Sequence, residues 1–146
     1  MPNHFHMVVK TKSELDILDT YNQQSSSKTN SPIYMILSNR FSNLFNSYAQ
    51  AYNNENDRKG SLFFNRFKRK TISDEKYLAK LIHYLHYNPV EAGLVNNIED
   101  WKFSSYKAFV GDSKTLIAKN EVIKLFESRA NFIYCHKTEP TLSGLE

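Results

Sequence analysis

The sequence has little of several features that define whole classes of protein. Its 146 residues include one cysteine, four glycines and four prolines. Cys135 cannot form an internal disulfide, and no Cys-x-x-Cys zinc spacing exists. The low glycine and proline content argues against collagen-like and low-complexity chains, and no apolar run reaches the roughly 18 residues of a membrane helix. The N-terminus does not resemble a signal peptide, so these absences predict a cytoplasmic protein without a membrane span.

Aromatic side chains, in contrast, are abundant. There are ten Phe, nine Tyr and one Trp, and 40% of the residues are hydrophobic. A disordered chain carries far fewer such residues, because it cannot bury enough apolar surface to offset the ordering entropy. The length and composition predict one soluble domain with a hydrophobic core.

The net charge of +4 is concentrated in one segment of the chain. The block from Arg58 to Lys70 contains no acidic residue and is interleaved with Phe63, Phe64 and Phe67. Basic groups among aromatic rings suit a phosphate backbone with unstacked bases, although a solvated basic strand end would have the same composition. The candidate nucleic-acid-binding residues are Arg58, Lys59, Arg66, Lys68, Arg69 and Lys70.

Periodicity and end signals predict strands and helices. Residues 4–10 and 61–72 have the short, alternating or β-branched pattern of strands, and residues 11–31 predict a loop with one helical turn. Ser31 and Pro32 predict the start of a helix of about twenty residues that ends near Asn53 and Asn54. A second helix is expected to begin near residue 75 and to end by Asn88, before Pro89.

The remainder of the chain predicts short helices. Gly93 is expected in the left-handed conformation, and helices are expected within 101–109 and 121–134. The C-terminal helices are expected to pack on the domain rather than to make an accessory DNA contact. His136 and Cys135 are interpreted as incidental neighbours.

Two pairs of polar side chains could carry chemistry. His4 and His6 alternate on a predicted strand, so both rings would project from one face and could bind one cation. Tyr84 and Asn88 are four residues apart on a predicted helix, so the hydroxyl and the amide lie on one face. Spacing alone also leaves a core-edge tyrosine and a helix-end asparagine open, as well as other candidates on the same helix. These are Tyr77, His83, His86 and Tyr87.

Several blocks occur together in an order that resembles a known family. The blocks are MPNHFHMVV, a long helix, GSLFFNRFKRK, YLHYNPVEAGLV and WKFSSY. Together they resemble the REP-associated tyrosine transposases, a branch of the insertion-sequence-200-like HUH single-strand nucleases. The resemblance extends from Met1 to about Phe109. It implies that His4 and His6 bind a divalent cation, Mg²⁺ or Mn²⁺, that Asn88 completes the metal site, and that Tyr84 is the nucleophile.

The resemblance also implies a reaction and a fold. Tyr84 would attack a phosphate of single-stranded DNA, in or beside a hairpin, and would be left as a 5′-phosphotyrosine with release of a 3′-hydroxyl. The expected fold class is α+β: a ferredoxin-like HUH domain over 1–110, with an antiparallel sheet covered by helices on one face, and a C-terminal helical extension over 111–146. The chain as given is expected to be predominantly helical.

The chain departs from the family at its beginning. Family members begin further upstream, with a strand and a helix that precede the histidine strand, so a truncated domain with exposed sheet edges is expected here. The alternative is therefore a catalytically inactive, DNA-binding remnant of such a transposase. A small phosphodiesterase unrelated to nucleic acids would explain the histidine pair but not the basic block. The residues leave both a monomer and a homodimer open.

Overall fold

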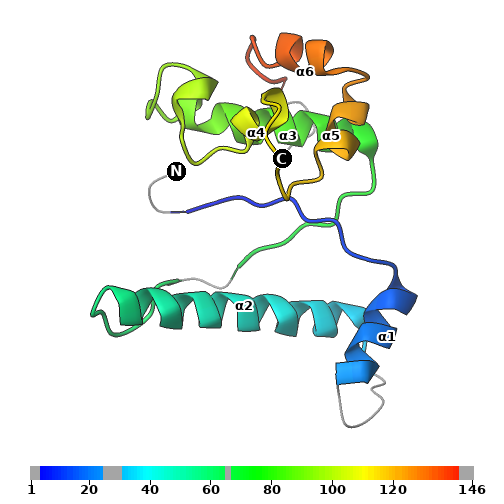
Figure 1. The fold of residues 1–146 in the computed structure, drawn as a ribbon, viewed down its shortest axis with the longest axis vertical. Coiled ribbons are helices and arrows are strands. Elements are labelled where there is room, and N and C mark those ends of the chain that lie inside the picture. Colours follow the sequence, from blue (N-terminus) through cyan, green and yellow to red (C-terminus); the bar gives the residue numbers. More distant parts are fainter. Residues whose placement is uncertain (1–3, 25–30, 65–66, 142–146) are drawn as a thin grey trace. The chain divides into compact units, whose positions relative to one another are not determined.

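A computed structural model describes residues 4–24, 31–64 and 67–141. These residues divide into two compact units, one from Val9 to Arg69 and one that combines the residues up to Val8 with those from Lys70 onwards. Each unit is described separately below. Figure 1 shows that the elements are helices joined by irregular segments.

The first unit consists of two helices and a segment that follows them. The first helix, α1, spans Glu14–Gln24, and the second, α2, spans Ile33–Glu55. The predicted loop over 11–31 therefore contains three turns of helix rather than one. Helix α2 agrees with the prediction in position and length, but Pro32 is its N-cap and makes no side-chain hydrogen bond, so the predicted Ser31 cap is displaced by one residue.

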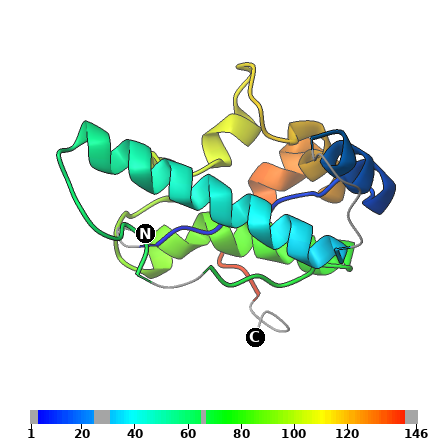
Figure 2. The same ribbon diagram turned by 90° about the horizontal axis from the view of Figure 1, so that it is seen from below.

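Beyond α2 the basic segment turns back along the helix, as both ribbon views show (Figure 1; Figure 2). It is held by aromatic contacts, because Phe63 lies 5.5 Å from Phe45 and Phe67 lies 5.8 Å from Phe41, measured between ring centroids. Phe63 and Phe67, on the two sides of residues 65–66, thus contact helix α2, and the described residues of this segment form no strand.

The second unit is built around α3, Glu75–Glu91. Asp74 caps this helix by accepting a hydrogen bond from the Tyr77 backbone amide at 2.5 Å, and the helix begins at the predicted position. The helix continues past Pro89 to Glu91, which corrects the prediction that it ends by Asn88. Because proline has no backbone N–H, α3 lacks the hydrogen bond that residue 89 would donate to the carbonyl four residues earlier, and the helix ends two residues after it. Gly93 then takes the predicted left-handed conformation, with φ +66°.

Short helices surround α3 and complete the core of this unit. They are η1 (Ile98–Asp100), α4 (Tyr106–Val110), α5 (Lys119–Leu125) and α6 (Arg129–Cys135). Phe132 of α6 is fully buried and belongs to one core cluster with Ile82, Tyr106, Phe109 and Phe126. The C-terminal helices therefore pack on α3 and α4, as expected; the predicted domain boundary at residue 110 stays a prediction.

The expected fold class is wrong for this chain. Across the described ranges there is no β-strand, and neither 4–10 nor 61–72 pairs with another extended segment. An antiparallel sheet needs hydrogen-bond partners for each strand, and a single strand is not stable alone. Residues 4–10 are exposed, including Phe5 and Met7 at 56% and 52%. The structure is helical, and the ferredoxin-like sheet is absent from the residues described.

Candidate functional site

His4 and His6 lie close together in the second unit. Their ring centroids are 5.2 Å apart and their planes are perpendicular, a separation at which two imidazoles can share one cation. Partial burial, and then the neighbouring His4, lower the pKa of His6. A lowered pKa favours the neutral imidazole, which is the form that binds a metal ion. The pair stays together even though the predicted strand does not form.

Tyr84 and Asn88 share one face of α3, roughly opposite the face on which Ile82 enters the core. Tyr84 is half-buried, and Asn88 is buried with 7% of its surface exposed. Nothing in the described part of the chain hydrogen-bonds to the Tyr84 hydroxyl. The two side chains are therefore placed together, one turn apart, as the spacing predicted.

The other two tyrosines of α3 are engaged elsewhere. The Tyr87 hydroxyl donates a hydrogen bond to Glu139 at 2.9 Å. That hydrogen bond is the main reason why the pKa of Tyr87 is raised, and a higher pKa disfavours the phenolate that acts as a nucleophile. Tyr77 has the Lys70 ammonium 5.2 Å from its ring centroid.

Three histidines form a buried cluster that the sequence did not reveal. His83, His86 and His136 are 9%, 4% and 5% exposed. His136 lies 4.6 Å from His83 and 5.1 Å from His86 between ring centroids. His136 is therefore a core residue rather than an incidental neighbour of Cys135. A signal for His86 was its position four residues after Ile82, on the apolar face of the helix.

Two of the three rings, those of His86 and His136, belong to one chain of hydrogen bonds whose donors can be assigned. His136 Nδ1 lies 2.8 Å from the Phe132 carbonyl, which can only accept, so this nitrogen carries a proton. In the neutral ring its Nε2 then accepts from His86 Nδ1 at 2.9 Å. His86 Nε2 in turn accepts from the Ser105 hydroxyl at 2.9 Å. Each ring of the chain is satisfied as a neutral imidazole.

Burial keeps these imidazoles neutral. Desolvation, followed by repulsion from His136 and His83, lowers the pKa of His86 to about 3. Desolvation likewise lowers the pKa of His136 to about 4, against the opposing hydrogen bond to Phe132. The pKa of His83 is also lowered by burial, while its hydrogen bond to the Thr138 carbonyl opposes the shift. The cluster is thus a structural element of the core.

The basic residues predicted to bind nucleic acid are exposed wherever the structure describes them. Arg58 lies over the Tyr52 ring at 5.7 Å, and an Arg69 guanidinium nitrogen donates to the Ser38 hydroxyl. Phe64, between them in sequence, is 92% exposed. Arg66 lies outside the described residues. The exposed basic side chains are Arg58, Lys59, Lys68, Arg69 and Lys70.

Metal binding would require a ligand of another type. In the described ranges, no three His, Cys, Asp or Glu side chains are grouped so that they could hold one metal ion. The His4 and His6 pair supplies two nitrogen donors. A third donor could be an amide oxygen such as that of Asn88, which does not belong to the four residue types just named.

The same part of the chain contains no helix of the length and apolarity that membrane crossing demands.

Comparison with known proteins identifies a similar sequence. The chain is 37% identical over 62 residues to a Haemophilus influenzae protein named "Putative REP-associated tyrosine transposase". The match covers 42% of this chain and 32% of the relative, so it spans about a third of the relative's length. No protein-family model matches the chain. No solved structure matches it either. The match supports the resemblance to tyrosine transposases at the level of the family.

Proposed function

We propose that this chain acts on single-stranded DNA as a metal-dependent transposase or endonuclease of the REP-associated tyrosine type. The observation that carries the proposal is the sequence similarity to the Haemophilus influenzae protein. The proximity of His4 to His6 and the shared helix face of Tyr84 and Asn88 support it. The proposed substrate is a strand that forms a hairpin, and the proposed location is the cytoplasm.

The residues present fit a divalent cation. His4 and His6 would supply two imidazole nitrogens, and Asn88 an amide oxygen, all of them neutral ligands. A bound Mg²⁺ or Mn²⁺ would polarise the scissile phosphate. Because the ligands are neutral, the charge of the ion would remain available to the DNA. The convergence of the histidine pair with Asn88 on one ion is part of the proposal.

Tyr84 would act as the nucleophile. A tyrosine hydroxyl is ordinarily protonated at neutral pH, so it must lose its proton as it attacks. The Tyr84 oxygen forms a bond to phosphorus, the bond from phosphorus to the 3′-oxygen breaks, and that oxygen leaves as a 3′-hydroxyl after it gains a proton. The 5′-phosphotyrosine keeps the energy of the broken bond, so a second strand could reverse the step without ATP.

An inactive, DNA-binding remnant is the second candidate. It is favoured by the absence, in the described ranges, of a group of three His, Cys, Asp or Glu side chains suited to a metal ion. Its DNA-binding surface would need only the exposed basic residues and the aromatic rings beside them. This candidate predicts DNA binding without any covalent product.

The decisive experiment is to trap the covalent intermediate. The protein is incubated with a hairpin oligonucleotide and Mn²⁺, and the products are separated under denaturing conditions. We expect a protein–DNA adduct that is lost in Tyr84→Phe, which removes one oxygen and keeps the ring. Tyr87→Phe is the matched control and should still form the adduct.

Each other outcome has a definite meaning. DNA binding without an adduct would favour the inactive remnant over the enzyme. An adduct that persists in Tyr84→Phe, and that mass spectrometry places on another tyrosine, would contradict the assignment of Tyr84.

A further inference from the structure

Helix α2 carries a row of amide side chains along one face. We define the amide row as Asn39, Asn43, Asn46 and Gln50, which follow one another at steps of four, three and four residues. These steps place the four side chains within about 60° of one another around a helix of 3.6 residues per turn. The Phe41 and Phe45 rings, which hold the basic segment, lie on the other side of the helix.

The side chains of the amide row are exposed, and their amides form no hydrogen bonds with the described part of the chain. Asn53, which follows the row on α2 and is not part of it, donates through its Nδ2 to the Gly60 carbonyl at 2.8 Å. The amide row therefore has its full donor and acceptor capacity available to a ligand.

The composition of this face is unusual for a helix surface in contact with water. Exposed helix faces ordinarily carry Glu, Lys and Arg, which are good helix formers. Between residues 39 and 54, α2 has one charged side chain, Arg40. Asparagine is a less favourable helix residue than alanine. Three asparagines in register thus weaken α2 without any packing benefit, which points to a role in recognition.

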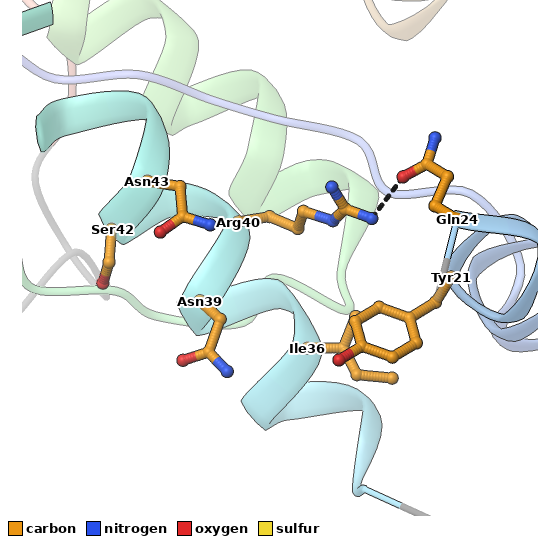
Figure 3. Close-up of a pocket in the computed structure, with 7 residues that line it drawn as sticks. All are labelled: Tyr21, Gln24, Ile36, Asn39, Arg40, Ser42 and Asn43. Carbon is orange, nitrogen blue, oxygen red and sulfur yellow. Dashed lines mark hydrogen bonds between the residues drawn. The ribbon is translucent and has the colours of Figure 1, made fainter. Parts of the chain in front are cut away.

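A groove lies beside the N-terminal half of the amide row, between α1 and α2 (Figure 3). Its volume is about 560 Å³, which is within the roughly 300–1,000 Å³ usual for small-molecule sites. Arg40 bridges the two helices, since its guanidinium donates to Gln24 at 2.5 Å and lies 5.7 Å from the centre of the Tyr21 ring. Asn39 and Asn43 line the α2 side of the groove.

The chemistry of the groove suits a neutral, polar ligand. Apart from the almost fully buried Ile36, every residue that lines it has a polar side chain, and Arg40 is the only charged one. Arg40 alone, with its guanidinium already hydrogen-bonded to Gln24, would bind a ligand with several phosphates only weakly. An apolar ligand would leave the side-chain amides without hydrogen-bond partners. Amides, which donate and accept side by side, match the edges of nucleobases.

We propose that the amide row and the adjoining groove bind base edges of unpaired nucleotides in single-stranded DNA. The same unit carries the exposed cations Arg58, Lys59, Lys68 and Arg69, which complement the negative charge of a nucleic acid. The inference rests on the proposed function and adds to it which side chains contact which part of the DNA. The cations contact phosphates, and the amide row contacts bases.

The test compares a normal strand with an abasic strand. Binding is measured by fluorescence anisotropy in EDTA, using a single-stranded oligonucleotide of mixed sequence and an abasic strand of the same length, which keeps its phosphates and sugars. We expect the protein to prefer the base-containing strand by about fivefold or more, since about fivefold is the lower end of the discrimination that one good bidentate amide–base pair gives. The triple variant N39A/N43A/N46A should lose this preference and keep its affinity for the abasic strand.

Asn120→Ala is the matched control. Asn120 is an exposed amide on α5 in the other unit, and its removal should leave the preference unchanged. Alanine is a better helix former than asparagine, so the triple variant should melt at the same temperature as the parent or higher. A loss of binding then cannot come from unfolding.

The remaining outcomes separate the inference from the proposed function. A parent protein that binds neither strand would overturn both. A triple variant that keeps the preference, or that loses affinity equally for the two strands, would overturn the role of the amide row while DNA binding itself stands.

Discussion

Acidification should unfold the second unit because its core contains neutral histidines. In an unfolded chain histidine has a pKa near 6.5, whereas burial lowers the pKa of His86 to about 3 and that of His136 to about 4. Between these values the unfolded state binds more protons than the folded state, so the free energy of unfolding falls as the pH falls. The stability is complete above pH 6.5 and is lost progressively as the pH drops towards 4.

The size of the effect follows from the same pKa values. At pH 5 each histidine that stays neutral costs the folded state about 2 kcal/mol relative to the unfolded chain, and the two together cost about 4 kcal/mol. Because a domain is typically stable by about 5–15 kcal/mol, this loss is a large fraction of the total. Protonation would also place two donors face to face where His86 now donates to His136.

The assay is urea denaturation from pH 7.5 to pH 5, above the range in which most carboxylates titrate. Near pH 5, the slope of the free energy of unfolding against pH should correspond to an uptake of about two protons on unfolding. In His86→Phe that uptake should fall by about one proton, although the absolute stability also falls because the His136 Nε2 acceptor loses its partner. A stability that stays constant over this pH range, or a His86→Phe variant with an unchanged slope, would refute the reasoning.

Three further outcomes are expected. His4→Ala or His6→Ala should abolish Mn²⁺-dependent cleavage and leave binding of single-stranded DNA largely intact; normal cleavage by either variant, measured on a denaturing gel, would show that the metal site is elsewhere. Replacing both Lys68 and Arg69 by Ala should reduce the slope of log affinity against log salt by about 1.4, because each phosphate contact with a single strand contributes about 0.7 to that slope through counterion release; an equal slope would exclude them as phosphate ligands. Phe132→Ala should lower the free energy of unfolding by about 3–5 kcal/mol, and a smaller loss in urea melts would mean that Phe132 is not the centre of the core.

The candidate site was only partly readable from the sequence. The spacing of Tyr84 and Asn88 placed them on one helix face, and the structure keeps them there. The hydrogen bond that engages Tyr87 could not be foreseen, because Glu139 is 52 residues away in the chain. The spacing of the amide row is present in the sequence of α2. Its interpretation as a binding site depends on the groove that α1 forms beside it.

The strand predictions failed for a physical reason. Residues 4–10 have the composition of a strand, yet a strand is stable only when a neighbour satisfies its backbone groups. No such neighbour exists among the residues that the structure describes. In the 61–72 segment, the alternation of aromatic residues instead places Phe63 and Phe67 against α2. The pattern of basic and aromatic residues was interpreted as a strand, but the element that these two rings contact is helix α2.

Features of the fold that depend on local interactions follow from the sequence. The length of α2, the Asp74 cap of α3 and the left-handed Gly93 all follow from residues within a few positions of one another, because helical hydrogen bonds are local. The tertiary structure decided the features that join distant residues. His86 and His136 are 50 positions apart, and only their shared burial makes them neutral, since desolvation acts through neighbours that the fold brings together.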